Sequence, residues 1–267
     1  MPSKWLPALT VGVIIFLCFR GVSAAPPDKP LIIPNLEAAE VYLESQMLRH
    51  GLKGMAAAII QGEEITYLRG FGSAGAGQPV TPKTPFFIGS VSKSFTALAV
   101  MQLVDQGLID LDSPIQTYIP WFTTLDQASS SQITVHHLLN QTSGLSNSSF
   151  KRPPITEETT LEETIRHLSQ ARLIAEPGTR FSYFNPNYNV LAQVVETVSG
   201  ISFSRYLVEN IFEPLEMKHS FVDRASAENA GLAVGHSIFF GFPIPRHQPF
   251  YPAEIPAGFI ISSVEDM

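Results

Sequence analysis

The sequence has a single cysteine, Cys18, in a chain of 267 residues. Phe16 and Leu17, which precede it, are too bulky for a lipoprotein cleavage site. If the N-terminal segment that contains Cys18 is removed, no thiol remains. The mature chain then has no disulfide, no cysteine-based metal site and no thiol nucleophile.

Positive charge is also scarce. Lys and Arg number 17 against 24 Asp and Glu, a net charge of −7 at pH 7. Loss of residues 1–25 would remove Lys4 and Arg20 but no acid, leaving 15 basic and 24 acidic residues and a net charge of −9. This balance argues against a nucleic-acid partner, since phosphate binding depends on Lys and Arg. It mainly favours solubility.

Several motifs of other enzyme classes are absent. Residues 72–77 are predicted to form a glycine-rich loop, but it lacks the Gly-Lys-Ser/Thr ending of a P-loop. Residues 71–75 lack the first glycine of G-x-S-x-G, which disfavours an α/β-hydrolase. His136 and His137 are adjacent, so they face different sides of a helix, and neither H-x-x-x-H nor H-E-x-x-H occurs. We therefore predict no metal and no cofactor.

The first 25 residues differ from the rest. Lys4 precedes an apolar run that ends at Phe19, and residues 22–25 are small enough for signal-peptidase cleavage. We predict a signal peptide at 1–25, with an uncleaved membrane anchor as the alternative. Prolines make 26–34 an extended linker, and 35–267 forms the domain. The chain is expected to be secreted or extracytoplasmic, in a periplasm or at a cell surface.

Hydrophobic periodicity and turn residues predict the elements of this domain. A helix covers 36–48 and ends near Gly51, and two strands flank a hairpin turn. Further helices are expected after Thr134, which is a suitable N-cap, and in the middle of the chain. The predicted strands are 55–60 and 65–71, and the later helices are 161–168, 187–198 and 202–211.

The tetrad Ser90-Val91-Ser92-Lys93 is an S-x-x-K motif, a signature of a serine nucleophile with a lysine partner. The apolar residues that follow predict a buried helix that ends at Gly107. A second S-x-x-K, from Ser148 to Lys151, runs into two prolines, so no helix can follow it. We interpret the second match as accidental.

The spacing of the first tetrad suits nucleophilic catalysis. Residues three apart lie on one face of a helix, so Ser90 and Lys93 can meet. A serine hydroxyl needs an adjacent base to take its proton, and burial favours the neutral, proton-accepting form of a lysine. The positive end of the helix dipole near Ser90 favours developing negative charge.

Tyr183-Phe184-Asn185 is the only Y-x-N in the sequence and lies 93 residues after Ser90. A phenol can relay a proton, and a carboxamide can hold a substrate amide. The alternative reading of this motif alone is a turn with a packed tyrosine.

With both motifs in place, the chain resembles the serine β-lactamase and penicillin-binding protein superfamily, specifically its class C β-lactamase-like branch. The resemblance runs from about residue 35 to the end. It is carried by the segments 87–93, 108–114, 133–145, 177–185 and 210–217.

The resemblance implies an α+β fold: an antiparallel sheet flanked by helices, plus a mostly helical lobe from the middle of the chain. It also implies roles for four residues. Ser90 forms the acyl-enzyme, Lys93 accepts its proton, Tyr183 passes the proton to the leaving group, and Asn185 orients the substrate. The backbone N–H of Ser90 supplies half of an oxyanion hole.

The chain departs from the superfamily in one respect. No Lys-Thr-Gly or His-x-Gly motif follows Tyr183. We therefore expect an N-terminal fragment that lacks the C-terminal strands and one oxyanion-hole donor. Since loss of such a donor costs about 3–4 kcal/mol, the fragment is expected to be nearly inactive.

Two functions remain open at this point. The first is a serine hydrolase that acts on β-lactam, D-alanyl peptide or ester substrates, so that the expected partner is a small molecule or a peptide. The second is a catalytically inactive binding or scaffold protein of the same fold. Contact with a membrane is expected only through an uncleaved N-terminal segment or a missing C-terminal part.

Overall fold

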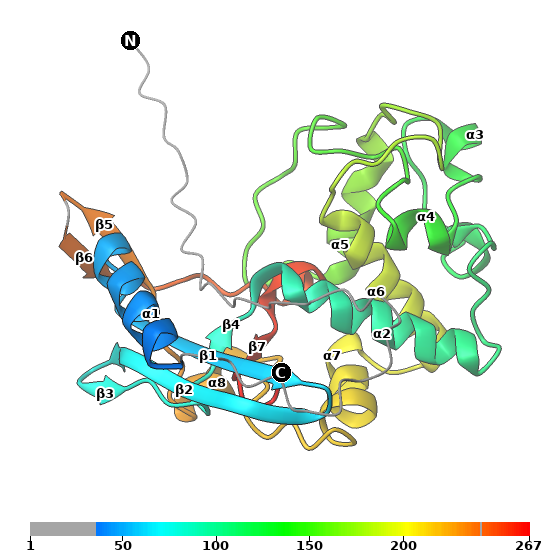
Figure 1. Ribbon diagram of the computed structural model, residues 1–267. Helices are drawn as coiled ribbons and strands as arrows, with labels where there is room; N and C mark the ends of the chain where they lie inside the picture. The colour runs from blue at the N-terminus through cyan, green and yellow to red at the C-terminus, as the bar shows by residue number, and fades with distance from the viewer. Residues whose placement is uncertain (1–35, 241) are drawn as a thin grey trace, which may run out of the picture. The chain divides into compact units, whose positions relative to one another are not determined.

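The computed structural model describes residues 36–240 and 242–267, which form two compact units (Figure 1). The first unit contains residues 36–86, 225–248 and 262–267, and the second contains 87–224 and 249–261. The predicted signal peptide and linker lie outside the described residues. Among the residues described, no helix is both long enough and apolar enough to cross a membrane.

The first unit is built on an antiparallel three-stranded sheet of order β1-β2-β3. Its core consists of Met47, Met55 and Phe71, which are buried against partly buried neighbours. The unit's elements are α1 (Leu36–His50), β1 (Gly54–Gln61), β2 (Glu64–Gly75), β3 (Gln78–Pro79), the antiparallel pair β5 (His236–Phe239) and β6 (Phe242–Pro245), and most of α8 (Arg224–Asn229).

The predicted helix and hairpin at the start of the domain are confirmed. Gly62 adopts φ +62° in the turn between β1 and β2, a conformation that favours glycine. The predicted loop at 72–77 is wrong in part, because β2 continues to Gly75. A side chain at Gly72 would place its Cβ 2.2 Å from the Lys53 carbonyl oxygen. The glycine therefore allows close strand contact rather than forming a loop.

The amphipathic pattern expected for α1 is only partly realised. Met47 is its buried residue, and Leu43 packs against the core. Val41, Tyr42 and Leu48 are exposed. Because the sheet offers one narrow contact face, most of the apolar side chains of this helix remain at the surface.

The second unit is mostly helical, with α6 at its centre. This helix contacts α2, α4, α5, α7 and the turn at residues 255–259, and its buried side chains form much of the core. The unit contains α2 (Ser92–Asp105), α3 (Gln127–Ser130), α4 (Val135–Leu139), α5 (Leu161–Arg166), α6 (Pro186–Ser199) and α7 (Phe203–Leu207). The predicted helices at 161–168, 187–198 and 202–211 are thus confirmed, although α5 and α7 end early and continue as 3₁₀ and π turns.

Helix α2, which follows Ser90 in the sequence, differs from its prediction on one face. Ala99, Val100 and Leu103 are buried as expected, but Leu98 and Met101 are about two-fifths exposed, at 40% and 44%. The helix is therefore buried on one side only. The short strand β4 (Phe86–Phe87) precedes it and pairs with β7 (Ile261–Ser262).

Candidate active site

Ser90 lies in a 3₁₀ turn, Gly89–Val91, directly before α2. Gly89 adopts φ +55°, and its carbonyl accepts a hydrogen bond from Ser92 Oγ at 2.7 Å. The turn is held at its start by Ile88, whose N–H donates to the Ile260 carbonyl at 3.1 Å. Ser90 itself is exposed. The fold thus presents a serine hydroxyl at the positive end of a long helix.

Tyr183 and Ser90 meet in the structure. Tyr183 Oη donates a hydrogen bond to Ser90 Oγ at 2.7 Å, although the two residues are 93 positions apart. A nucleophile within hydrogen-bonding distance of a group that can carry its proton is the geometry that nucleophilic catalysis requires. Two of the residues predicted from sequence are therefore brought into direct contact.

Lys93 is buried beside the same tyrosine. Its Nζ lies 4.8 Å from the ring centroid of Tyr183 and 5.6 Å from that of Tyr188. It donates a hydrogen bond to the Ala257 carbonyl oxygen. Within the described part of the chain, the hydroxyl of Ser90 is hydrogen-bonded to the phenol and not to the lysine. Tyr183 thus contacts the predicted nucleophile through its hydroxyl and the predicted base through its ring.

The chain segment that meets Lys93 is fixed along one face of α2. Thr96 Oγ1 donates to the Pro256 carbonyl at 2.8 Å, and the Ile260 N–H donates to Ser92 Oγ at 3.1 Å. These bonds lie on either side of the contact made by Lys93. They hold the carbonyl of Ala257 where the lysine reaches it.

The buried carboxylate of Glu254 also fixes the segment that contains Ala257. Glu254 is 5% exposed and forms an ion pair with Arg152. Its Oε1 also accepts a hydrogen bond from Asn189 Nδ2 at 2.7 Å. Buried charge needs such partners. Sequence reasoning missed this cluster, and the available signal was an acidic residue inside an otherwise apolar stretch, Ala253 to Pro256.

Asn185 stands at the N-terminal end of α6, next to the tyrosine turn. Its Oδ1 is buried and has no hydrogen-bond partner among the described residues. Buried polar atoms are nearly always paired in folded proteins. Asn185 lies two residues after Tyr183, and its substrate-orienting role stays a prediction.

The turn that carries Tyr183 is held by Gln141, which sequence reasoning missed. Gln141 is 6% exposed and adopts φ +62°, which is uncommon for a residue with a side chain. Its Oε1 accepts from Phe184 N–H at 3.0 Å and from Asn187 Nδ2 at 2.7 Å. Its carbonyl accepts from Ser182 N–H at 2.8 Å. Gln141 therefore anchors the chain on both sides of Tyr183.

The two adjacent histidines follow a helix cap. Thr134 is the N-cap of α4, as predicted, and His137 Nδ1 accepts a hydrogen bond from the Thr134 N–H at 3.3 Å. Burial lowers the pKa of His137. No group of three or more His, Cys, Asp or Glu side chains that could hold a metal ion occurs within 36–240 and 242–267.

The second S-x-x-K lies in a turn. Ser148 Oγ is 2.8 Å from Ser146 Oγ, and no helix begins at Lys151, as predicted. This serine is therefore not at the N-terminus of a helix, unlike Ser90.

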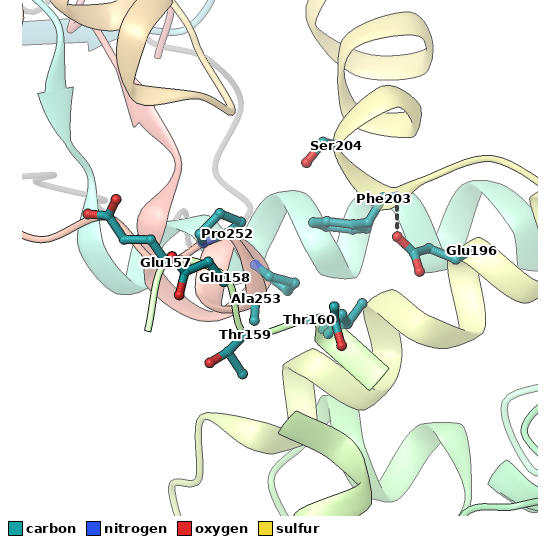
Figure 2. A pocket seen from close by; sticks show the side chains of 11 residues that line it. Glu157, Glu158, Thr159, Thr160, Glu196, Phe203, Ser204, Pro252 and Ala253 are labelled. Carbon is teal, nitrogen blue, oxygen red and sulfur yellow. Dashed lines mark hydrogen bonds between the residues drawn. The ribbon is translucent and has the colours of Figure 1, made fainter. Parts of the chain in front are cut away.

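A pocket of about 280 Å³ lies in the second unit (Figure 2). It is lined by the segment 157–161 that leads into α5, by the first residues of α7 and by the turn at 252–256. Glu196 is at its edge and accepts a hydrogen bond from the Phe203 N–H at 2.8 Å. None of the four predicted site residues lines this pocket. We place the candidate active site at the Ser90–Tyr183 contact, because two of the residues predicted for catalysis meet there.

Comparison with known proteins gives a family match over most of the chain. The family model Beta-lactamase matches residues 39–267. Protein flp of Staphylococcus aureus (strain MW2) is 24% identical over 85% of this chain and 46% of its own length. The putative penicillin-binding protein PbpX of Bacillus subtilis (strain 168) is 29% identical over 81% of this chain and 53% of its own. The chain thus spans about half the length of these curated relatives.

Solved structures confirm the fold predicted from the resemblance. An octameric penicillin-binding protein homologue from Pyrococcus abyssi matches with a TM-score of 0.75 and 33% identity, over 86% of this chain and 54% of that one. EstCE1, a hydrolase with promiscuous acyltransferase activity, matches at 0.74 and 25%, over 86% and 70%. A class C β-lactamase, at 0.72 and 23% over 85% and 60%, supports the fold alone.

Proposed function

The chain belongs to the Beta-lactamase family of serine hydrolases, and on that premise we propose that it acts by acyl transfer through an acyl-enzyme on Ser90. The observation that supports the proposal most directly is the 2.7 Å hydrogen bond between Tyr183 Oη and Ser90 Oγ. It joins the two sequence motifs, so that both could act on one substrate.

The proposed acylation step uses three side chains. Ser90 Oγ attacks the substrate carbonyl carbon and forms an ester bond, while its proton passes to the Tyr183 oxygen. The phenol proton passes in turn to the Nζ of Lys93, the predicted base, which is buried beside the ring. As the bond to the leaving group breaks, the proton returns through Tyr183 to that group. Water then hydrolyses the ester and restores Ser90.

Electrostatic support comes from the start of α2. The Ser90 N–H is proposed as one oxyanion-hole donor, and the helix dipole favours the negative oxygen of the tetrahedral intermediate. The second donor is expected from a Lys-Thr-Gly or His-x-Gly motif, which these 267 residues do not contain. On this basis the 267-residue chain is proposed to be acylated slowly.

Asn185 favours a substrate with an amide. Its buried Oδ1 has no partner among the described residues and can accept one N–H bond. β-Lactams with an acylamino side chain and D-alanyl peptides carry such an N–H, whereas a simple ester does not. Esters remain in the proposal, because one relative, EstCE1, is described as a hydrolase with promiscuous acyltransferase activity.

The cellular location of the reaction is proposed from the N-terminal sequence pattern. Residues 1–25 read as a secretory signal, so the substrate would be met outside the cytoplasm. The alternative function is an inactive binding or scaffold protein of the same fold. The presence of all four predicted site residues, Ser90, Lys93, Tyr183 and Asn185, counts against it.

Acylation of Ser90 tests the proposal. The chain is exposed to a penicillin and, separately, to an activated ester, and its intact mass is followed with time. We expect a mass gain in wild type and in Ser148→Ala, and none in Ser90→Ala. Ser148 is the matched control, because it begins the other S-x-x-K. The same reagents are applied to a longer gene product that continues past residue 267. If neither reagent adds mass to that product and neither releases its leaving group in a burst, the scaffold function replaces the hydrolase.

A further inference from the structure

The β5–β6 hairpin carries an unusual concentration of exposed apolar side chains. Phe240 is 87% exposed, Phe242 72% and Phe239 60%, and Ile238 on β5 is about half exposed. The rings of Phe239 and Phe240 contact each other edge to face, at 4.6 Å between centroids. None of these residues belongs to the core around Met47. Exposed apolar groups of this size mark an interaction surface.

The hairpin lies at the end of α1, within the first unit (Figure 1). A Cβ added to Gly51 would lie 3.2 Å from Ile238 Cδ1. Leu48, in the last turn of α1, is 85% exposed. The end of the helix thus adds an exposed leucine to the exposed apolar residues of the hairpin.

The charge around these apolar residues is reversed relative to the whole chain. The chain has 24 acidic and 17 basic residues. The segments 48–53 and 233–248, in contrast, contain no Asp or Glu. They contribute Arg49, Lys53 and Arg246, all of which are exposed, and three histidines. Arg49 and Lys53 lie two residues to either side of Gly51, which approaches Ile238, and Arg246 lies four residues after Phe242. All three basic residues face solvent.

We propose that this surface binds the interface of an anionic lipid bilayer. The three phenylalanines would enter the boundary between headgroups and acyl chains, and the basic residues would contact the headgroups. Aromatic residues beside Lys and Arg are the composition that such interfaces favour. A side chain as exposed as Phe240 protrudes, and a fluid apolar layer accepts a protruding ring without the fitted pocket that protein anchors occupy. This membrane contact is independent of any N-terminal anchor and of the proposed hydrolase activity.

Fluorescence gives a site-specific test. Phe240→Trp reports insertion at the hairpin, and Phe181→Trp, at a residue 66% exposed in the second unit, is the matched control. Both variants carry Trp5→Phe and Trp121→Phe, so that the introduced residue is the one tryptophan that contributes signal. With vesicles of phosphatidylglycerol and phosphatidylcholine containing brominated acyl chains, we expect a blue shift and quenching for Trp at 240 and neither for Trp at 181. An unquenched tryptophan at 240 overturns the proposal, even if the chain pellets with the vesicles.

Substitutions then separate the apolar and charged contributions. In the Phe240→Trp background, Arg49→Gln, Lys53→Gln and Arg246→Gln should each lower vesicle affinity about fivefold, and phosphatidylcholine alone should bind weakly. Ile60→Ser with Ile65→Ser is the control: these residues are 51% and 54% exposed but flank Glu63 and Glu64 at the far end of β1. If the control pair weakens binding as much as the basic residues do, the surface is not specific. If Phe239→Ser changes the oligomeric state of the chain but not its affinity for vesicles, the surface is a protein–protein contact and not a membrane contact.

Discussion

Gln141 should control how well Tyr183 is held against Ser90. Replacing Gln141 by Leu keeps the side-chain volume roughly constant but removes Oε1. The Phe184 N–H and the Asn187 amide would then lose the acceptor that they share. Both are buried, and water cannot replace the bond at little cost.

The magnitude follows from the number of groups left unpaired. Each buried polar group without a partner costs about 1–3 kcal/mol, and the substitution creates two. It also removes Gln141 Nε2, which is itself buried and has no partner in the described part of the chain. The net cost is therefore that of about one group, roughly 1–3 kcal/mol. If the turn shifts, this corresponds to roughly 5- to 150-fold slower acylation of Ser90.

The assay measures both possible effects in the same variant. Rate constants for the Ser90 adduct come from quenched intact-mass measurements, and stability comes from thermal unfolding. Gln116→Leu is the matched control, because Gln116 donates one hydrogen bond to the Phe122 carbonyl, away from the tyrosine turn. We expect Gln116→Leu to lower stability only. Gln141→Glu, which keeps an acceptor, should retain more activity than Gln141→Leu.

The reasoning is refuted by one clear result. If Gln141→Leu is acylated at the wild-type rate and unfolds at the wild-type temperature, the two hydrogen bonds neither position the turn nor stabilise it. If stability falls but the rate per folded molecule is unchanged, Gln141 is structural and Tyr183 is positioned by other contacts.

Three further predictions concern the phenol of Tyr183, the buried carboxylate of Glu254 and the partly buried imidazole of His137. Tyr183→Phe should slow acylation by about 10²- to 10⁴-fold with little change in unfolding temperature, since the side chain is 45% exposed; a wild-type acylation rate would remove the tyrosine from the mechanism. Glu254→Gln should lower the free energy of unfolding by about 3–5 kcal/mol, because it leaves the Arg152 partner uncompensated, and denaturant titration should show a smaller loss when Arg152→Met is combined with it. Burial lowers the pKa of His137 below the usual 6.5, so its protonation opposes folding: stability should be full above that pH and fall as the pH drops below it. Unfolding temperature against pH should therefore show a shallower acid slope in His137→Gln, and parallel slopes would contradict this.

Local features of the fold could be predicted because their causes lie within a few residues. The side chain of Thr134 caps its helix by accepting a hydrogen bond from the backbone one turn ahead. Gly62 lies in the hairpin turn between two antiparallel strands, β1 and β2. Gly200 ends α6 in a left-handed conformation, φ +76°, which favours glycine. The tetrad Ser90–Lys93 identified a helix N-terminus by the same kind of short-range pattern.

The failures of prediction also have a common cause. Leu98 and Met101 of α2, like Tyr42 of α1, are apolar and exposed, because burial depends on which face meets a neighbour and not on composition alone. Gly72 was read as a loop residue, since nothing in the sequence shows how closely Lys53 approaches it.

By itself, the sequence determined the type of chemistry: a serine and a lysine on one helical turn, a tyrosine and an asparagine in a later turn, and no thiol or metal motif. The tertiary structure alone decided how these groups meet. It placed Tyr183 against Ser90 across 93 positions and the Ala257 carbonyl against Lys93 across 164. It also placed Gln141 against the turn that carries Tyr183 and paired Glu254 with Arg152, and no sequence motif indicates either role. Sequence patterns describe neighbours along a helix or strand, whereas contacts between distant segments depend on how whole elements pack.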